Sequence, residues 1–169
     1  MNLNRQIPPP ICPLSDIHVT YPESQRLKNG IPLHVIRAGM EDVVRFDLLI
    51  GAGQWHQTQA LQAMFTNRML REGTSSLTSQ QIAEKLDYYG AMMELSSSVN
   101  CGFITLYSLN KYFPQTIELV ADMLMNPTFP AKEMEVVVEV NKQRFLINST
   151  RVEMMGRKRL NRALFGEAH

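Results

Sequence analysis

The spacing of apolar residues changes once early in the chain, and this change constrains the fold more than any other feature. The segment VVRFDLLIGAG at 43–53 is nearly continuous in apolar character, which is typical of a central strand covered on both faces. Shortly after it the spacing becomes helical, i, i+3, i+4 and i+7, at Leu61, Met64, Phe65 and Arg68. A chain that passes from strand to helix in this way is expected to pack helices against a sheet.

A β-hairpin is predicted before this strand, in SQRLKNGIPLHVIRAG. Asn29-Gly30 is a strong signal for a type I′ turn, in which both central residues need positive φ. The flanking strands are expected at 25–28 and 31–37. Pro32 places its strand at a sheet edge or at a strand start, because proline has no N–H to donate.

The middle of the chain predicts a second helix followed by two strands. In TSQQIAEKLDYYG, Thr78 and Gln81 have the spacing of a capping box, and Gly90 stands where the helix should stop. Two strands are expected at 91–98 and 102–109. The first helix is bounded in a simpler way, with Thr58 as its N-cap and Gly73 as its C-terminal stop.

Three more helices are expected in the last third of the chain. One carries an apolar stripe from Phe113 to Leu124, and NPTFP ends it. A long helix starts near Ala131, with Met134, Val138, Asn141 and Phe145 expected on one face. A final helix runs from about Arg151 to Phe165. The order β-β-β-α-α-β-β-α-α-α predicts an α+β fold, with an antiparallel, mixed-edge sheet of about five to six strands and helices packed on one face.

Composition excludes several classes of protein. Hydrophobic residues make up 44% and charged residues 20% of 169 residues, which is typical of a globular chain and not of a disordered one. The net charge of +1 favours neither nucleic acid nor a membrane as partner. No apolar run reaches the roughly 18 residues that a membrane span needs.

The sequence predicts an extended arm at the N-terminus and a chain that continues beyond the segment given. Residues 1–23 form a predicted extended, Pro-rich arm without an apolar signal region, and 24–169 the folded domain, which we expect to be a fragment of a longer chain. The two cysteines, Cys12 and Cys101, have no metal-binding spacing. A reduced, cytoplasmic setting is expected.

The histidines, the methionines and the basic residues do not by themselves predict a metal or nucleic-acid site. The histidines, at positions 18, 34, 56 and 169, form no H-x-x-H or H-x-x-x-H pair, so local spacing predicts no zinc site. The eleven methionines favour adaptable core packing over copper binding. Seven basic residues lie between Lys142 and Arg162 with Glu153 as the acidic exception. This stretch is interpreted as a solvated face or a surface that meets an acidic partner subunit, and less readily as a nucleic-acid surface.

Several phrases together resemble the N-terminal domain of an M16 peptidase subunit, of the insulinase, pitrilysin or mitochondrial-processing-peptidase type. The phrases, in order, are RLKNGIPLHVI, LLIGAG, MLREGT, IAEKLDYYGAMMELSSS and LVADMLMNPTFPAKEMEVVVEVNKQRF. They extend from about residue 24 to 169. The resemblance implies the LuxS/MPP-like metallopeptidase fold.

In the family, MLREGT would follow an inverted zinc motif, H-x-x-E-H. Met64 stands here in place of the first His, Asn67 in place of the Glu, and Arg68 in place of the second His. The third ligand, a Glu about 76 residues further on, corresponds to Arg144, and a companion Glu corresponds to Val137.

The resemblance therefore implies a degenerate site with no metal and no catalytic residue in this chain. Arginine is permanently cationic and only donates hydrogen bonds, so it cannot ligate a dication, and Asn67 cannot act as general base. The family's zinc is expected on a partner. The edge strand that pairs with substrate peptides in the family corresponds to Glu94, Leu95, Ser96 and Ser97.

The expected function is that of a non-catalytic subunit or half, which closes the chamber and helps bind peptide. Its expected partners are a homologous domain or subunit with H-x-x-E-H and peptide substrates, with no nucleic acid and no membrane span. One alternative is the inactive domain of a single-chain zinc metalloendopeptidase whose metal site lies elsewhere. Another is a purely structural scaffold, like the core subunits of respiratory complexes.

Overall fold

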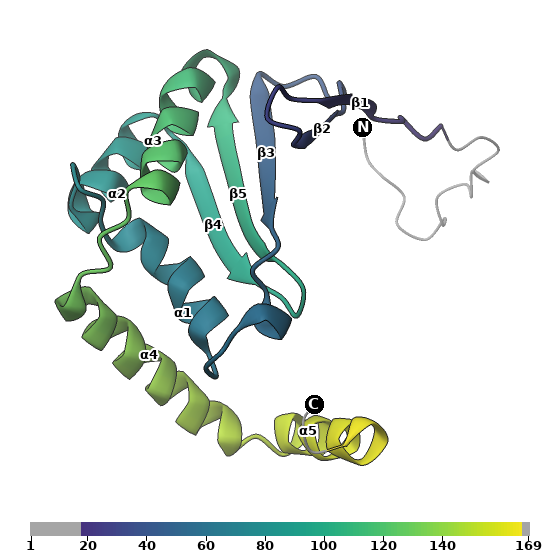
Figure 1. Cartoon of the computed structure of the whole chain (residues 1–169), viewed down its shortest axis with the longest axis vertical. Helices are drawn as coiled ribbons and strands as arrows, with labels where there is room; N and C mark the ends of the chain where they lie inside the picture. The colour runs from purple at the N-terminus through teal and green to yellow at the C-terminus, as the bar shows by residue number, and fades with distance from the viewer. Residues whose placement is uncertain (1–17, 167–169) are drawn as a thin grey trace, which may run out of the picture. The chain divides into compact units, whose positions relative to one another are not determined.

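The structure is a computed structural model that describes residues 18–166 (Figure 1). Most of the predicted arm at 1–23 therefore lies outside the described residues, as do Cys12 and His169. The chain divides into two compact units, Met1–Glu41 and Asp42–His169, and each is described by itself. The predicted domain boundary after residue 23 stays a prediction.

The described part of the first unit is a β-hairpin. Strand β1 (Glu23–Arg26) pairs antiparallel with β2 (Pro32–Val35), so Pro32 does start its strand as predicted. The type I′ prediction is wrong, because only Gly30 has positive φ. The N–H of Gly30 donates to the carbonyl of Leu27, and the loop closes with a Leu27-to-Ile31 hydrogen bond. The turn is thus longer by a residue, and glycine alone takes the left-handed conformation.

The second unit contains a three-stranded antiparallel sheet. Its order is β3 (Val43–Ile50), β5 (Gly102–Leu109) and β4 (Met92–Ser97). The predicted order of elements and the α+β class are confirmed. The described strands form two sheets, however, where a single sheet of five to six was expected. The strands β1 and β2 are only four residues long and hydrogen-bond to each other.

Strand β3 differs from its prediction. It pairs with β5 alone among the described residues, and its side chains alternate between half-buried and exposed. Arg45 and Asp47 lie on the exposed face, where they bind each other and the neighbouring strand. The sequence does not show this alternation, because the exposed face also carries the apolar residues Val43 and Leu49.

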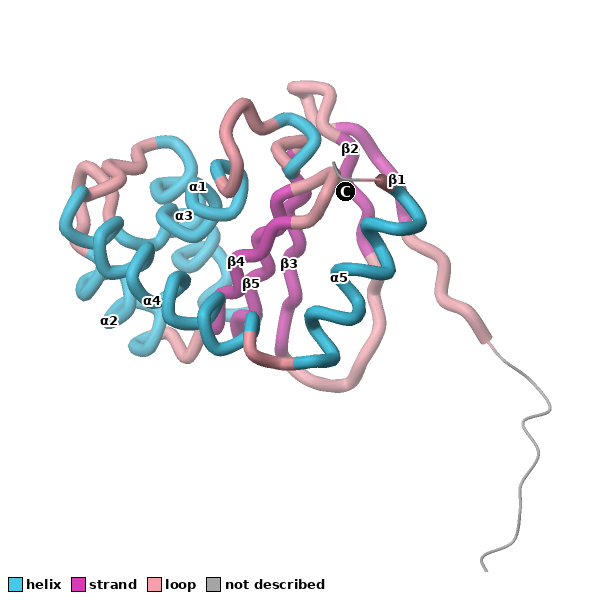
Figure 2. The backbone as a smooth tube through the Cα atoms, turned by 90° about the horizontal axis from the view of Figure 1, so that it is seen from below, coloured by secondary structure: helices cyan, strands magenta, loops and turns pink. Residues whose placement is uncertain are grey.

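Helices α1 (Gln62–Met69), α2 (Ser79–Tyr88) and α3 (Phe113–Met125) lie on one face of the sheet (Figures 1 and 2). Short 3-10 turns η1 (Gln54–His56), η2 (Leu70–Glu72) and η3 (Asn110–Tyr112) precede or extend them. The capping box of α2 is confirmed, with both reciprocal hydrogen bonds between Thr78 and Gln81.

The start of α1 corrects the Thr58 prediction. The helix begins after Leu61, and no side-chain hydrogen bond caps it from that residue. The Gln62 side-chain carbonyl instead accepts from both the N–H and the hydroxyl of Thr58, and the Gln57 side-chain carbonyl accepts from the N–H of Ala63. The Gln57 side chain thus satisfies a first-turn N–H of the kind that the Thr58 hydroxyl was expected to satisfy.

The core lies between the sheet and these helices. Leu70, Ile104, Leu106 and Val120 form its centre, and Ile82, Leu119 and Met123 form a second cluster. Met69 and Met123 support the packing interpretation of the methionines, whereas Met40, Met92 and Met125 are exposed. The buried Thr116 hydroxyl donates to Ser108, so two polar side chains in this layer satisfy each other.

Two further helices complete the unit. Helix α4 (Ala131–Ser149) packs against α1, and α5 (Val152–Phe165) turns away from the axis of α4 (Figure 2). The predicted inward face of α4 is right for Met134 and Asn141, which are half-buried. It is wrong for Val138 and Phe145, which are exposed, and Val137 is the buried residue instead. No residue of α5 is buried within the described part of the chain. None of the helices within residues 18–166 combines the length and the apolar content that a membrane span requires.

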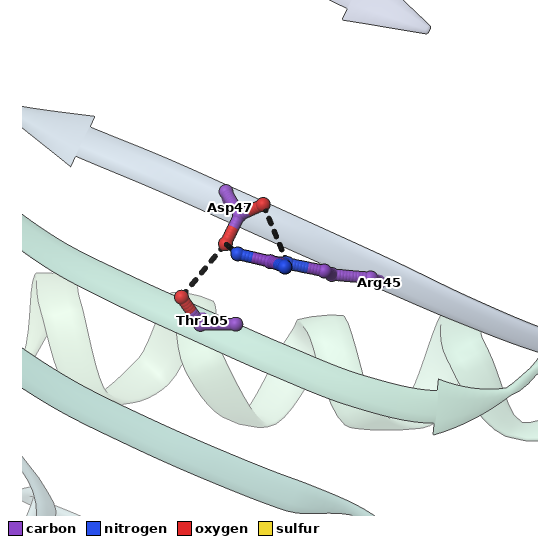
Figure 3. Close-up of polar contacts among 3 residues, drawn as sticks. All are labelled: Arg45, Asp47 and Thr105. Carbon is purple, nitrogen blue, oxygen red and sulfur yellow. Dashed lines mark hydrogen bonds and ion pairs between the residues drawn. The ribbon is translucent and has the colours of Figure 1, made fainter. Parts of the chain in front are cut away.

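The exposed face of the sheet carries an ion pair (Figure 3). Arg45 contacts Asp47 through Nε at 2.9 Å and Nη2 at 3.1 Å, and the Thr105 hydroxyl donates to Asp47 at 2.7 Å. Partial burial favours the neutral carboxyl, but the hydrogen bonds from Thr105 and Arg45 and the Arg45 charge outweigh it. The pKa of Asp47 is therefore lowered below its usual 3.8.

A lowered pKa makes the fold sensitive to acid. The stabilisation from Asp47 is present above the pKa of the unfolded chain and is lost as the pH falls below about 3.8 and through the folded pKa. We expect Asp47→Asn to flatten the acid limb of the thermal midpoint plotted against pH, and Thr105→Val to flatten it in part. Asp87→Asn, on the exposed face of α2, is the control. An unchanged acid limb in Asp47→Asn would contradict this assignment.

Candidate functional site

Helix α1 carries the three residues that stand at the positions of the H-x-x-E-H zinc motif. The spacing i, i+3 and i+4 puts Met64, Asn67 and Arg68 on neighbouring positions of one helix side. Met64 and Arg68 are half-buried, and Asn67 is buried. The helix packs against β4, β5 and α4. Arg68 lies on the side of α4, where it contacts Asn141, and Asn67 lies on the side of β5, near Gly102.

Arg68 connects α1 to α4. Its Nη1 donates to Oδ1 of Asn141 over 3.4 Å, and the Asn141 amide nitrogen donates to the carbonyl of Val137 over 2.6 Å. The Asn141 side chain is therefore oriented with its oxygen towards the guanidinium. The sequence placed Asn141 on an inward face of the helix but did not reveal this contact.

Arg144 stands close to one helical turn beyond Asn141 and is exposed. Within residues 18–166 it makes no hydrogen bond or ion pair with Met64 or Arg68. The structure thus brings Arg68 to the turn between Val137 and Asn141 and leaves Arg144 in solvent.

The donors at these positions do not fit the zinc ion that the fold family uses. Zinc is held by imidazole, thiolate or carboxylate groups. Here the corresponding groups are a thioether, an amide and two guanidiniums, of which the guanidiniums only donate hydrogen bonds. In the described part of the chain no three His, Cys, Asp or Glu side chains lie close enough to hold a metal ion.

The proposed peptide edge lies on β4. This strand pairs with β5 on one side, and no other described strand pairs with its opposite side. Glu94 and Ser96 are exposed on the outer face, while Leu95 and Ser97 are half-buried towards the helices. The backbone N–H and C=O groups of this open side can accept an added strand whatever the side chains are.

The basic residues between 142 and 162 lie on α4 and α5 and at the junction between the two helices. All seven are exposed. Apolar residues of α5 are exposed beside them, including Val152, Leu160 and Leu164. A solvated or partner-facing surface remains the interpretation of this stretch.

The comparisons with known proteins agree with this fold. The family described as insulinase, peptidase family M16, matches residues 35–168. A peptidase M16 inactive domain from Pseudomonas fluorescens aligns with a TM-score of 0.77 at 20% identity, over 83% of this chain and 35% of that one. A protease from Helicobacter pylori aligns with a TM-score of 0.66 at 17% identity, over 77% and 32%. The chain thus spans about a third of each of these structures. A search of curated proteins finds no match.

Proposed function

The chain belongs to the insulinase family of peptidases, family M16, and we propose that it is a non-catalytic subunit or half of such an enzyme. In this role it closes the peptide chamber and helps hold the peptide for a homologous domain or subunit that bears H-x-x-E-H and zinc. The observation that carries the proposal is a sheet-and-helix scaffold whose positions for metal ligands hold Met64, Arg68 and Arg144.

Two physical arguments support the loss of catalysis. The hydrogen bond from Arg68 to Asn141 keeps a permanent positive charge where a dication would have to bind. Asn67 has no carboxylate to take a proton from water, so the general-base step has no group to perform it. One of the similar structures is itself described as an inactive M16 domain.

The unpaired side of β4 supports a retained role in peptide binding. Strand addition uses backbone hydrogen bonds, which do not depend on the replaced side chains of Glu94, Leu95, Ser96 and Ser97. A single-chain enzyme in which this domain is the inactive half would use the same edge. A scaffold without substrate, of the respiratory-core type, would not.

Metal content and peptidase activity test the proposal. The full-length protein, equilibrated with zinc chloride and then desalted, is expected to retain no stoichiometric zinc by elemental analysis and to cleave no peptide. Mixed with its zinc-bearing partner, it should raise peptide cleavage, and a chelator should abolish that cleavage. Arg68→Ala is the matched variant, which removes the charge without supplying a ligand and should leave zinc retention absent.

Stoichiometric zinc in the isolated protein, or chelator-sensitive cleavage by it alone, would refute the proposal. A labelled peptide that binds the assembled complex distinguishes a peptide-holding half from a scaffold. An H-x-x-E-H motif in a neighbouring reading frame favours a heterodimer, and the same motif further along this chain favours a single-chain enzyme. The cytoplasmic setting stays a prediction.

A further inference from the structure

A pocket of about 270 Å³ lies between α1 and the sheet, apart from the open side of β4. Ile50 at the end of β3 and Gly102 at the start of β5 contribute to its wall, and Leu70 and Leu124 line it from the helix side. No residue of β4 lines it. The strand β5 separates β3 from β4, so the pocket is distinct from the proposed peptide edge.

Asn67 is the unusual residue of this pocket. It is 7% exposed and lines the pocket, yet its side-chain amide makes no hydrogen bond with any residue in the range 18–166. Thr116, another buried polar residue, instead donates to Ser108. No side-chain nitrogen or oxygen of the described residues is fully enclosed without a partner, so the amide of Asn67 opens into the pocket.

Gly102 makes room for the amide. A Cβ at this position would stand 3.2 Å from Nδ2 of Asn67, tighter than most side-chain contacts. The missing side chain therefore leaves the amide with space on the side of the sheet. A ligand that reaches this end of the pocket can meet both the donor and the acceptor of the amide.

The remaining wall decides what kind of ligand fits. No Asp, Glu, Lys or Arg lines the pocket, and its titratable residue is His56 at the rim. A charged ligand would lose its hydration without meeting an opposite charge, which is strongly unfavourable. The apolar wall of Ile50, Leu70 and Leu124 favours an apolar body.

We propose that this pocket binds a neutral small molecule that has a compact apolar body and one amide group, with the amide paired to Asn67. A cavity of about 150 Å³ lined by apolar side chains already holds benzene, so the present volume accommodates a ring together with an amide. This proposal goes beyond the peptide-holding role and does not depend on it.

Benzamide is the probe that tests the pairing, with toluene and benzoate as companions of similar shape. Amide resonances of the ¹⁵N-labelled full-length protein are followed during titration. Benzamide is expected to shift Gly102 and Gly53 saturably. Toluene should shift the same residues with about tenfold weaker affinity, because it leaves the Asn67 amide unpaired. Benzoate should produce no saturable shift.

Variants distinguish binding in this pocket from binding elsewhere on the protein. Asn67→Leu is expected to weaken benzamide about tenfold while toluene binds at least as well. Asn161→Leu, an exposed asparagine of α5, is the matched control and should leave both unchanged. If Asn67→Leu does not fold, Leu124→Phe tests the same site, since it fills the pocket and should remove the binding of both probes.

Three outcomes would overturn the proposal. One is the absence of a saturable benzamide shift in the wild-type protein. Another is equal affinity of the wild-type and Asn67→Leu proteins for benzamide. The third is a set of shifts centred on residues away from Gly102 and Gly53, which would place binding elsewhere on the protein.

Discussion

Replacing Gly53 by alanine is expected to lower the free energy of unfolding by about 3 kcal/mol, and folding is expected to fail if the loop cannot move. A Cβ at this position would lie 2.3 Å from the carbonyl carbon of Asn100 and 2.5 Å from both the nitrogen of Cys101 and the oxygen of Val99. All three are backbone atoms, so no rotamer change relieves the clash.

Backbone hydrogen bonds accompany the close approach of Gly53 to the turn between β4 and β5. The N–H groups of Gly53, Gln54 and Trp55 donate to the carbonyls of Asn100, Ser98 and Val99. These hydrogen bonds hold the segment that leads into α1 against the turn between β4 and β5. Displacing them would loosen the start of α1, which carries Met64, Asn67 and Arg68.

Gly51 is the matched control for this prediction. It stands two residues earlier in the same GAG segment and does not have positive φ, and a Cβ added there would meet no atom within 4 Å. Urea unfolding of Gly51→Ala is expected to match the wild type closely. Equal midpoints for the two alanine variants would contradict the close approach seen at Gly53.

The second large effect is expected at Leu106. Its side chain is 0% exposed, and it lies on the central strand β5 at the centre of the core. Leu106→Ala removes most of this side chain where β3, β4 and the helices meet. The loss of burial and the cavity left behind together cost about 3–4 kcal/mol.

Leu49 provides the comparison on the same sheet. It is 58% exposed on the outer face of β3, so Leu49→Ala should change the unfolding free energy by less than about 1 kcal/mol. Denaturant midpoints measured with a common slope give both values. A loss at Leu49 as large as that at Leu106 would mean that the outer face of the sheet is covered in the native protein.

Local patterns were sufficient for most of the fold. The order of strands and helices follows from apolar spacing, and the capping box of α2 follows from Thr78 and Gln81, because both depend on residues a few positions apart. The stop between α3 and α4 follows from NPTFP in the same way.

The errors fall where several residues compete for the same group or the same place. Thr58 does not cap α1, because the helix begins after Leu61 and the Gln57 side chain accepts from the N–H of Ala63. Strand β3 was expected at the sheet centre, but β5 takes that place, and the apolar residues Val43 and Leu49 face outward. Val138 was expected on the inward face of α4, but the structure buries Val137 instead.

Residue identity alone shows that Met64, Arg68 and Arg144 do not form a zinc site. The kind of metal ligand that a side chain can supply depends on its chemical groups and not on its surroundings. Only the folded chain decides their places. Arg68 reaches Asn141, Arg144 stays in solvent, and Asn67 faces the pocket beside Gly102. Such contacts join segments far apart in the chain, and no local spacing encodes them.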